Sequence, residues 1–359
     1  MIIRFVKGCM LVVCVLAGIW LVSNLGYAID AVAHDRVQVT LMPGATAEEI
    51  VARYPGLTLI QKEPGLIVGY PEAEEREYKR LLSMDRQIDL TLAVPKFPSF
   101  DWERYGMALK GSLDTYSQGK LGEITFQTEI YPRNEPLEKH LGAMVKRTFS
   151  YLIPAFVLAV AGGLLIVLLA VLLPRLGKVL DVLNRLLLSL PDFFLIVMIQ
   201  YAAVMIDKKA GKTLIVALQF QDRTPFLIPL LGIAMLPGAI LYGTLRLAFA
   251  REWQEAYVRT AYAKGLTRPM VVLSHLLRNT WEDLLAVLPR MVLVAVTSMV
   301  AAEVITWTFG LGGYAFAQGV VSVSSLPVTC AILAVFTLVT NGLIAWVRHR
   351  RAVAFKEGK

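Results

Sequence analysis

The chain has 359 residues, of which 56% are hydrophobic and 18% charged, and its formal net charge is +8. Soluble domains usually carry about 25% charged residues, so the shortage of charge argues against an ordinary soluble globule. A basic balance can indicate a nucleic-acid partner, but here the Lys and Arg residues gather at the ends of long apolar segments, which is typical of membrane proteins and argues against nucleic acid.

Six segments are apolar over nearly the length that a helix needs to cross a bilayer, which is about 20 residues. They are Gly8–Ile29, Tyr151–Leu173, Leu186–Ile206, Pro225–Leu245, Leu284–Trp307 and Leu326–Val347. Prolines inside them do not exclude helices, because helices in a bilayer tolerate proline where neighbouring groups satisfy the freed carbonyls. The sequence therefore predicts an all-α membrane protein with six transmembrane helices and one inserted segment.

Residues 1–30 are predicted to form the first of these helices. A signal peptide is the alternative, because Met1–Gly8 is basic and Ala31–Ala33 resembles a cleavage site. The apolar run between them is longer than the core of a usual signal peptide. We therefore expect a first helix that is not cleaved.

Residues 31–150 are of a different kind, with charges of both signs and short alternating runs. Arg36–Met42 and Gln87–Val94 alternate as strands do, and Glu72–Met84 has a helical pattern. The order strand, helix, strand, strand, helix, strand is that of the split ferredoxin-like fold. We predict an α+β insertion, and the number of preceding spans places it outside the cytoplasm. No further element is predicted before the second span.

Basic residues indicate the side of the membrane that each connection occupies, because cytoplasmic loops are enriched in Lys and Arg. They gather before the first span, after the second, between the fourth and fifth, and in the tail at 351–359. With six spans, all these segments lie on one side, so both termini are predicted to be cytoplasmic. Lys208, Lys209 and Lys212, between the third and fourth spans, depart from the rule.

The connection at 250–282 combines positive charge with helix-forming residues. No helix breaker follows Gly243 until Gly265, which stands where a left-handed helix stop is expected. Thr267 can cap a second helix. We therefore predict a helix, a glycine turn and a second helix. Such a protrusion suits docking into a groove of a soluble partner, while a plain surface loop is the alternative.

The residues of this loop resemble the EAA loop in the membrane subunits of ABC importers, in the form found in peptide and nickel permeases. Tyr257–Leu266 reads YVRTAYAKGL, and HLLRN follows at His275–Asn279. Glu303–Val328 is similar to the family's segment with an acid, an aromatic residue and a G-L-G run, although Phe309 replaces the usual proline. The resemblance covers about residues 101–350, and the start of the chain looks like the B-type of the family's two halves.

The resemblance implies the type I permease fold of ABC importers for a core at 151–350. It also implies three kinds of protein partner besides membrane lipid: a second homologous permease subunit, two ATPase subunits and an extracytoplasmic substrate-binding protein. The chain itself is expected to be no enzyme and to bind no cofactor, because ATP and Mg²⁺ belong to the ATPases. Peptides are the leading substrate class, nickel or another small solute the alternative, and the bacterial cytoplasmic membrane the expected location.

In the family this loop is the coupling helix, which seats in a cleft of the ATPase. The resemblance assigns to this contact Tyr257, Arg259, Thr260, Ala261, Ala263, Lys264, Gly265, Leu266, His275 and Arg278. Gly265 would permit a sharp turn, while Ala261 and Ala263 would keep the contact close. Arg259 and Lys264 would offer charge-assisted bonds. His275 is expected to pack or to bond a helix end, and no metal site is predicted.

Three ionisable residues, Asp192, Arg290 and Glu303, lie in or beside the predicted spans. Such groups are costly in hydrocarbon and usually face a cavity or a partner helix, so they are candidates for the lining of the translocation path. Structural pairing near the membrane surface is the alternative, and for Glu303 the alternative is a bond to a helix terminus. Ala210–Thr213 ends like a Walker A motif, but position 206 lacks the glycine that the motif requires.

Two other classes of function are alternatives to a transporter. A membrane-anchored enzyme would need a catalytic constellation in the insertion, and none is visible. A non-transport membrane protein could use the loop at 250–282 for a different cytoplasmic partner. Binding of an ATPase to that loop distinguishes the last class from a transporter.

Overall fold

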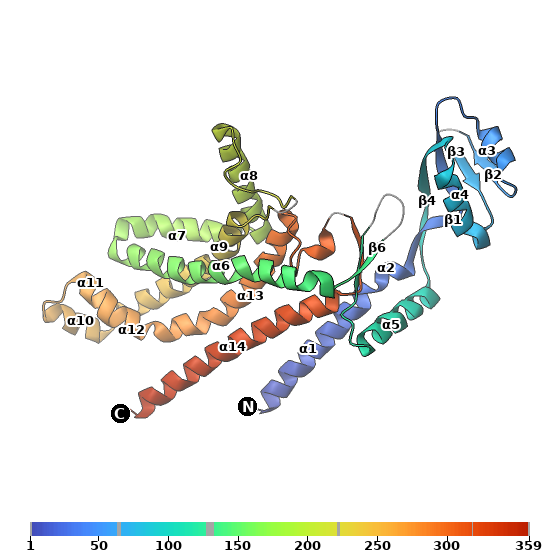
Figure 1. Ribbon diagram of the computed structural model, residues 1–359. Helices are drawn as coiled ribbons and strands as arrows, with labels where there is room; N and C mark the ends of the chain where they lie inside the picture. The colour runs from blue at the N-terminus through green and yellow to red at the C-terminus, as the bar shows by residue number, and fades with distance from the viewer. Residues whose placement is uncertain (1, 63–65, 127–132, 221–222, 318, 358–359) are drawn as a thin grey trace. The chain divides into compact units, whose positions relative to one another are not determined.

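The computed structural model describes residues 2–62, 66–126, 133–220, 223–317 and 319–357 (Figure 1). Within these ranges the side chains of residues 2–9, 11, 30–32, 321–323 and 351–357 are outside the description, so the charges of the predicted tail are not placed. The chain divides into two compact units. The first comprises Met1–Ser23 with Ser112–Lys359, and the second is Asn24–Gly111.

Long helices make up most of the first unit. They are α1 (Ile2–Ser23), α6 (Glu138–Leu172), α7 (Pro174–Ser189), α8 (Asp192–Ala210), α9 (Leu227–Glu252), α13 (Trp281–Ile305) and α14 (Leu326–Glu357). Within the described ranges, α6, α9, α13 and α14 are the 4 helices long and apolar enough to cross a membrane, or 5 if α7 and α8 count as one bent span. The predicted first span is represented by a shorter apolar stretch, Val12–Ala28. The structure therefore supports four or five of the six predicted spans.

The predicted third span, Leu186–Ile206, is not one helix. Helix α7 ends at Ser189, α8 begins at Asp192, and the two helices are bent by 109°. Leu190 and Pro191 between them have extended backbones, with ψ angles of 141° and 145°. A residue before proline is disfavoured in the helical conformation, because the proline ring clashes with it. The pair Leu190–Pro191 thus marks a break, where the apolar pattern alone predicts a continuous helix.

Helix α9 packs along both α6 and α13, and these three helices form the core of the first unit (Figure 1). Small residues let α6 and α9 approach closely. A Cβ added at Gly163 would lie 3.0 Å from the carbonyl oxygen of Gly238, and Ala159, one turn before Gly163, is buried. Small residues four apart are typical of closely packed membrane helices. The spacing of α6 and α9 therefore depends on Gly163.

A small antiparallel sheet connects distant parts of the first unit. Strand β5 (Glu123–Phe126) pairs with β6 (Arg133–Pro136), just before α6, and with β7 (Val320–Val323), just before α14. In the same unit, the hydroxyl of Tyr116 donates to the carbonyl of Ser324. The sheet, in the order β6-β5-β7, gathers the starts of α6 and α14 at one end of the helices.

The second unit has an α+β fold with its own core. Its elements are α2 (Leu25–Ala28), β1 (Ile29–Leu41), α3 (Ala47–Arg53), β2 (Thr58–Gln61), β3 (Leu66–Gly69), η1 (Glu72–Glu74), α4 (Glu75–Met84) and β4 (Ile88–Phe100). All strand pairs are antiparallel, in the order β2-β3-β1-β4. Buried Val37, Val39, Ile50, Val68 and Leu82 fill the core. The strands and main helices follow the order that the alternating pattern predicts, with β3 between β1 and β2 as in a split ferredoxin-like fold.

The boundaries of the two units differ from those predicted. The insertion was predicted at 31–150, whereas the second unit ends at Gly111 and the residues from Ser112 onward belong with the long helices. The long helix α6 already begins at Glu138, ahead of its apolar part. Ala31–Ala33, the alternative cleavage site, lies inside strand β1.

Helix α5 (Trp102–Ser117) was not predicted. Asp101 begins it, because its Oδ1 accepts hydrogen bonds from the backbone N–H groups of Glu103 at 2.9 Å and Arg104 at 3.1 Å. An aspartate in this position is a strong helix start signal, so Asp101 was the residue from which α5 could have been predicted. Gly106 and Gly111 weaken the helical pattern that follows.

We expect Gly163→Leu to destabilise the first unit, with Gly162→Leu as the matched control. At Gly163 even a Cβ would lie 3.1 Å from Leu241 Cδ2, whereas at Gly162 it would meet no atom within 4 Å. Overpacking of a core costs typically about 1–3 kcal/mol. Thermal unfolding of the full chain in detergent should show a lower Tm for Gly163→Leu and little change for Gly162→Leu. Equal shifts in both variants would contradict this account of the packing between α6 and α9.

Candidate functional site

The charged loop between α9 and α13 folds as a compact hairpin of short helices, which we call the hairpin (residues 253–280). Its elements are α10 (Ala256–Ala263), α11 (Arg268–Val271), the π-helical turn η2 (Val272–Leu276) and α12 (Leu277–Asn279). Gly265, between α10 and α11, has a φ of 81°, a left-handed conformation that glycine adopts without strain. The predicted glycine turn is therefore present. Thr267 stands at the N-cap of α11, but its side chain makes no capping bond.

The helix that was predicted to run unbroken from Gly243 to the glycine turn is interrupted after Glu252. Its Oε2 atom accepts hydrogen bonds from the Tyr257 hydroxyl at 2.8 Å and from Asn279 Nδ2 at 3.3 Å. Burial raises the pKa of Tyr257 to about 12, and the bond to Glu252 acts in the same direction, so this hydroxyl stays a donor at neutral pH. Glu252 thereby joins the entry of the hairpin to its exit.

Arg268 fastens the hairpin to the end of α6. Its Nη2 atom donates to the carbonyl of Val171 at 2.8 Å, and its guanidinium lies over the ring of Trp253, 4.9 Å from the centroid. Val171 is in the last turn of α6, where carbonyls have no partner within the helix. Arg251 Nη2 also donates to Asp283 Oδ2 at 2.8 Å, which joins the end of α9 to the start of α13. The hairpin is thus tied to α6, and the two helices that flank it are tied to each other.

The predicted contact residues divide between the inside and the outside of the hairpin. Ala261 is buried, Tyr257, Leu266 and His275 are half-buried, and Arg259, Thr260, Ala263, Lys264, Gly265 and Arg278 are exposed. Ala261 was expected to touch an outside partner, but with Val258 it forms the inward side of α10, as residues three apart on a helix do. His275 packs near Tyr257, with ring centroids 6.4 Å apart.

Three exposed apolar side chains of the hairpin were not singled out from the sequence. Tyr262, Met270 and Leu273 are exposed alongside the basic Arg259 and Lys264. We call these five residues the exposed hairpin surface. Little in the sequence indicated that these side chains are exposed, because apolar residues in a loop next to membrane spans are expected to pack inward.

Glu303 is fully buried and organises the loop that follows α13. Its Oε2 atom accepts hydrogen bonds from the backbone N–H groups of Gly312 and Gly313, both at 2.7 Å. Its Oε1 atom accepts from the Thr148 hydroxyl at 2.5 Å and from the Tyr151 hydroxyl. The prediction that Glu303 lines a path is therefore corrected, because both of its oxygens are engaged inside the chain by α6 and by this loop.

Glycine is required at Gly310 and Gly313, because the backbone there lies too close to Glu303 for a Cβ atom. A Cβ at Gly313 would lie 2.5 Å from the Cβ of Glu303 and 2.8 Å from the carbonyl oxygen of Thr308. Phe309, where the resembling family has proline, donates its backbone N–H to Gln219 Oε1 at 2.9 Å, a bond that proline cannot make. Its carbonyl accepts from Arg147 Nη1 at 2.6 Å.

Asp192 and Arg290 lie apart from this network. Asp192 begins α8, where its Oδ1 accepts from the backbone N–H of Phe193 at 2.8 Å and its Oδ2 from the Ser298 hydroxyl of α13 at 3.3 Å. Arg290 is exposed on α13. The three ionisable residues are therefore not gathered into one site.

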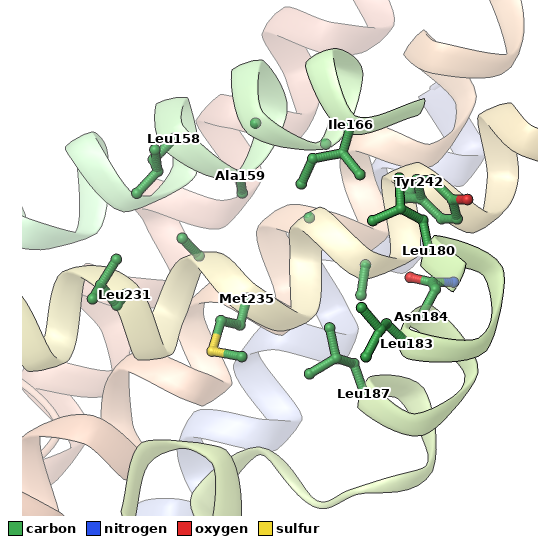
Figure 2. Close-up of a pocket in the computed structure, with 15 residues that line it drawn as sticks. Leu158, Ala159, Ile166, Leu180, Leu183, Asn184, Leu187, Leu231, Met235 and Tyr242 are labelled. Atoms are coloured by element: carbon green, nitrogen blue, oxygen red, sulfur yellow. The ribbon is translucent and has the colours of Figure 1, made fainter. Parts of the chain in front are cut away.

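A cavity of about 390 Å³ lies between α6, α7 and α9, and none of these three ionisable residues lines it. Figure 2 labels Leu158, Ala159, Ile166, Leu180, Leu183, Asn184, Leu187, Leu231, Met235 and Tyr242 around it. The Tyr242 hydroxyl donates to Asp181 Oδ1 at 2.6 Å, and Arg246 pairs with the same atom at 3.1 Å. The cavity was not predicted, and small residues such as Gly162 and Gly238 in its walls were the only sign of it.

The segment that resembles the end of a Walker A motif has a structural explanation, and possible metal ligands do not gather in the described residues. In the segment that ends like a Walker A motif, Gly211 has a φ of 67° and terminates α8. Throughout the described residues, no group of three or more His, Cys, Asp or Glu side chains is placed to hold a metal ion.

We expect Glu303→Gln to loosen the loop after α13, with Glu282→Gln, exposed on the same helix, as control. Glutamine has one acceptor oxygen and one amide donor in place of two acceptors. Either its NH2 group faces the glycine N–H groups, which then lose their acceptor, or it faces the hydroxyls, which must turn and accept instead of donating. An unsatisfied buried group costs about 1–3 kcal/mol. Hydrogen exchange should become faster at Gly312 and Gly313 only in Glu303→Gln. Unchanged exchange would show that Glu303 does not hold this loop.

We expect Arg268→Met to free the hairpin from α6 without unfolding the long helices. Methionine keeps the apolar stem but loses the bond to Val171 and the contact of the charge with Trp253, which together contribute about 1–2 kcal/mol. Exchange of backbone amides in α10–α12 should speed up several-fold. Arg278→Met, an exposed change in the same hairpin, should leave exchange as it is. The same acceleration in both variants would rule out a specific role for Arg268.

Comparison with known proteins agrees with the helical core. Residues 159–353, more than half of the chain, match the family described as "Binding-protein-dependent transport system inner membrane component". Among solved structures, a chain of the MetNI methionine ABC transporter in an inward-facing conformation is similar, with 14% sequence identity and a TM-score of 0.41. The similarity covers 61% of this chain and 95% of that chain. It is too distant to carry an argument. No curated protein sequence matches. The chain belongs to the family of inner-membrane components of binding-protein-dependent transport systems, the permease subunits of ABC importers.

Proposed function

We propose that this chain forms half of the translocation path of a peptide importer and that ATPase subunits drive it through the hairpin. Membership of the family supports the general part of the proposal, namely that the chain is a multi-pass membrane permease that works with an ATPase and a substrate-binding protein. The peptide class is supported by the resemblance of Tyr257–Leu266 to the loop of peptide permeases. The same resemblance leaves nickel or another small solute as the alternative substrate.

The observation that carries the proposal is that the exposed hairpin surface stands on a rigidly tied base. Arg259, Lys264 and Tyr262 are exposed, while Glu252 and Arg268 bind the hairpin to itself and to α6. Because α9 and α13 continue directly into the hairpin, a force on the exposed surface reaches both helices. A plain surface loop would not need these ties.

The proposed assembly contains a second homologous permease subunit and two ATPase subunits, one on each hairpin. The hairpin end of the helices and both termini then lie in the cytoplasm, and the second unit lies outside with the substrate-binding protein. ATP binding closes the ATPases, the hairpins move, and the path between the two permeases changes its open side. Arg290, exposed on α13, is the remaining ionisable candidate for a surface that faces this path. Asp192 is engaged with Ser298 and is the weaker candidate.

Charge reversal on the hairpin tests this function. We expect Arg259→Glu combined with Lys264→Glu to reduce ATPase recovery on the order of tenfold when the complex is purified after mild crosslinking, because charged pairs at an interface contribute strongly to specific contact. Lys209→Glu with Lys212→Glu, at exposed positions beyond the hairpin, is the matched control. ATP-driven uptake of labelled peptides by the reconstituted complex should fall in parallel.

Two results would count against the proposal. Equal recovery of ATPase in both double variants would remove the hairpin from the contact. Full binding of ATPase without uptake of any peptide by the native complex would keep the coupling role and exclude peptides as the substrate class.

A further inference from the structure

A group of exposed apolar side chains lies where the second unit begins and ends. Tyr27, Ile29, Phe100 and Trp102, which we call the aromatic patch, are all exposed, Trp102 to 76%. They are held in place by folded structure. Ile29 is paired with Phe100 across β1 and β4, and the backbone N–H of Asp101 donates to the carbonyl of Ala28 at 2.9 Å.

Two rings of the patch contact each other, and a third ring packs beside them. The Phe100 and Trp102 centroids are 4.5 Å apart in an edge-to-face arrangement, and Tyr105 lies 5.6 Å from Phe100. Trp102 nevertheless keeps most of its surface free. An ordered group of exposed aromatic side chains on a small folded unit marks an interaction surface more often than an accident of composition.

The covalent chain limits how far this patch can lie from the end of helix α1, which contains the predicted first span. Helix α1 ends at Ser23, and Ala28 follows five residues later, so it lies at most about 18 Å away even if the connection were fully extended. Residues Leu25–Ala28 are helical, which shortens the reach. Residues within this reach of the end of the predicted first span can enter the zone where headgroups meet hydrocarbon, and Trp and Tyr collect in that zone.

We infer that the aromatic patch inserts into the interfacial zone of the bilayer and holds the second unit against the lipid surface. The indole of Trp and the phenol of Tyr suit this zone, because each has an apolar body and one polar group. The charges beside the patch fit as well. Arg104 pairs with Asp101 at 3.3 Å, which reduces the cost of bringing both toward lipid. The inferred partner is the lipid surface itself, and a protein partner is the outcome that would replace it.

Tryptophan fluorescence of the full chain in liposomes tests the inference. The emission of Trp102 is obtained as the difference between the unaltered chain and Trp102→Phe, a change at an exposed position that keeps an aromatic ring. We expect this difference emission to be shifted to the blue and quenched at least twofold by phospholipids brominated in their acyl chains. Acrylamide, a quencher dissolved in water, should have little effect on it.

Met84→Trp, made in the Trp102→Phe background, is the matched control. Met84 is also on a helix of the second unit and is 70% exposed, but it is distant in sequence from the end of α1. Its added emission should be quenched by acrylamide and not by brominated lipid.

Three outcomes would overturn the inference. Emission of Trp102 that only acrylamide quenches would place the patch in water. Protection of Trp102 from both quenchers would indicate a protein surface as its partner. Equal quenching of both positions by brominated lipid would show that the whole unit lies on the membrane and that the patch has no special part in it.

Discussion

Backbone polar groups inside a bilayer must find partners within the protein, and the first unit is arranged around that requirement. Side chains from neighbouring helices satisfy the backbone groups at helix ends and in the adjoining loops. Arg268 donates to the carbonyl of Val171, Arg147 to that of Phe309, and Glu303 accepts from the amides of Gly312 and Gly313. Arg268 and Arg147 each join two elements that are far apart in the sequence, and Glu303 does so through its bonds from Thr148 and Tyr151. The long helices are therefore locked together mainly where they end, while their middles pack through small and apolar residues.

This requirement explains why an ionisable residue in an apolar segment is an ambiguous sign. Glu303 was expected on a translocation path because charge is costly in hydrocarbon, yet its cost is offset by four hydrogen bonds inside the chain. A sequence shows that such a residue must have partners, but not whether they are substrate or backbone. The glycines at 312 and 313 were the better sign, since their lack of a Cβ allows their amides to approach a carboxylate.

Structural features that depend on residues close together in the chain could be predicted from the sequence. Features that depend on contacts between distant residues could not. The apolar runs of α6, α9, α13 and α14, the left-handed Gly265 and the strand and helix order of the second unit can all be read locally. The break after Glu252 depends on Tyr257 and Asn279, which reach its carboxylate only in the folded hairpin. The inward position of Ala261 likewise depends on which side of α10 meets the core. The bend at Leu190–Pro191 was readable from the proline, but a continuous apolar pattern masked it.

The ties between α6 and α13 have a consequence for motion. In its first half, α6 is bound through Thr148 and Tyr151 to Glu303 at the end of α13, and near its end it is bound through Val171 to the hairpin that precedes α13. These two points on α6 are about 30 Å apart along the helix, and α9 packs between the same partners. A displacement at the hairpin therefore moves α6, α9 and α13 as one body. Bending must then occur elsewhere, and the link between α7 and α8 is a candidate for it, because Leu190 and Pro191 have extended backbones there.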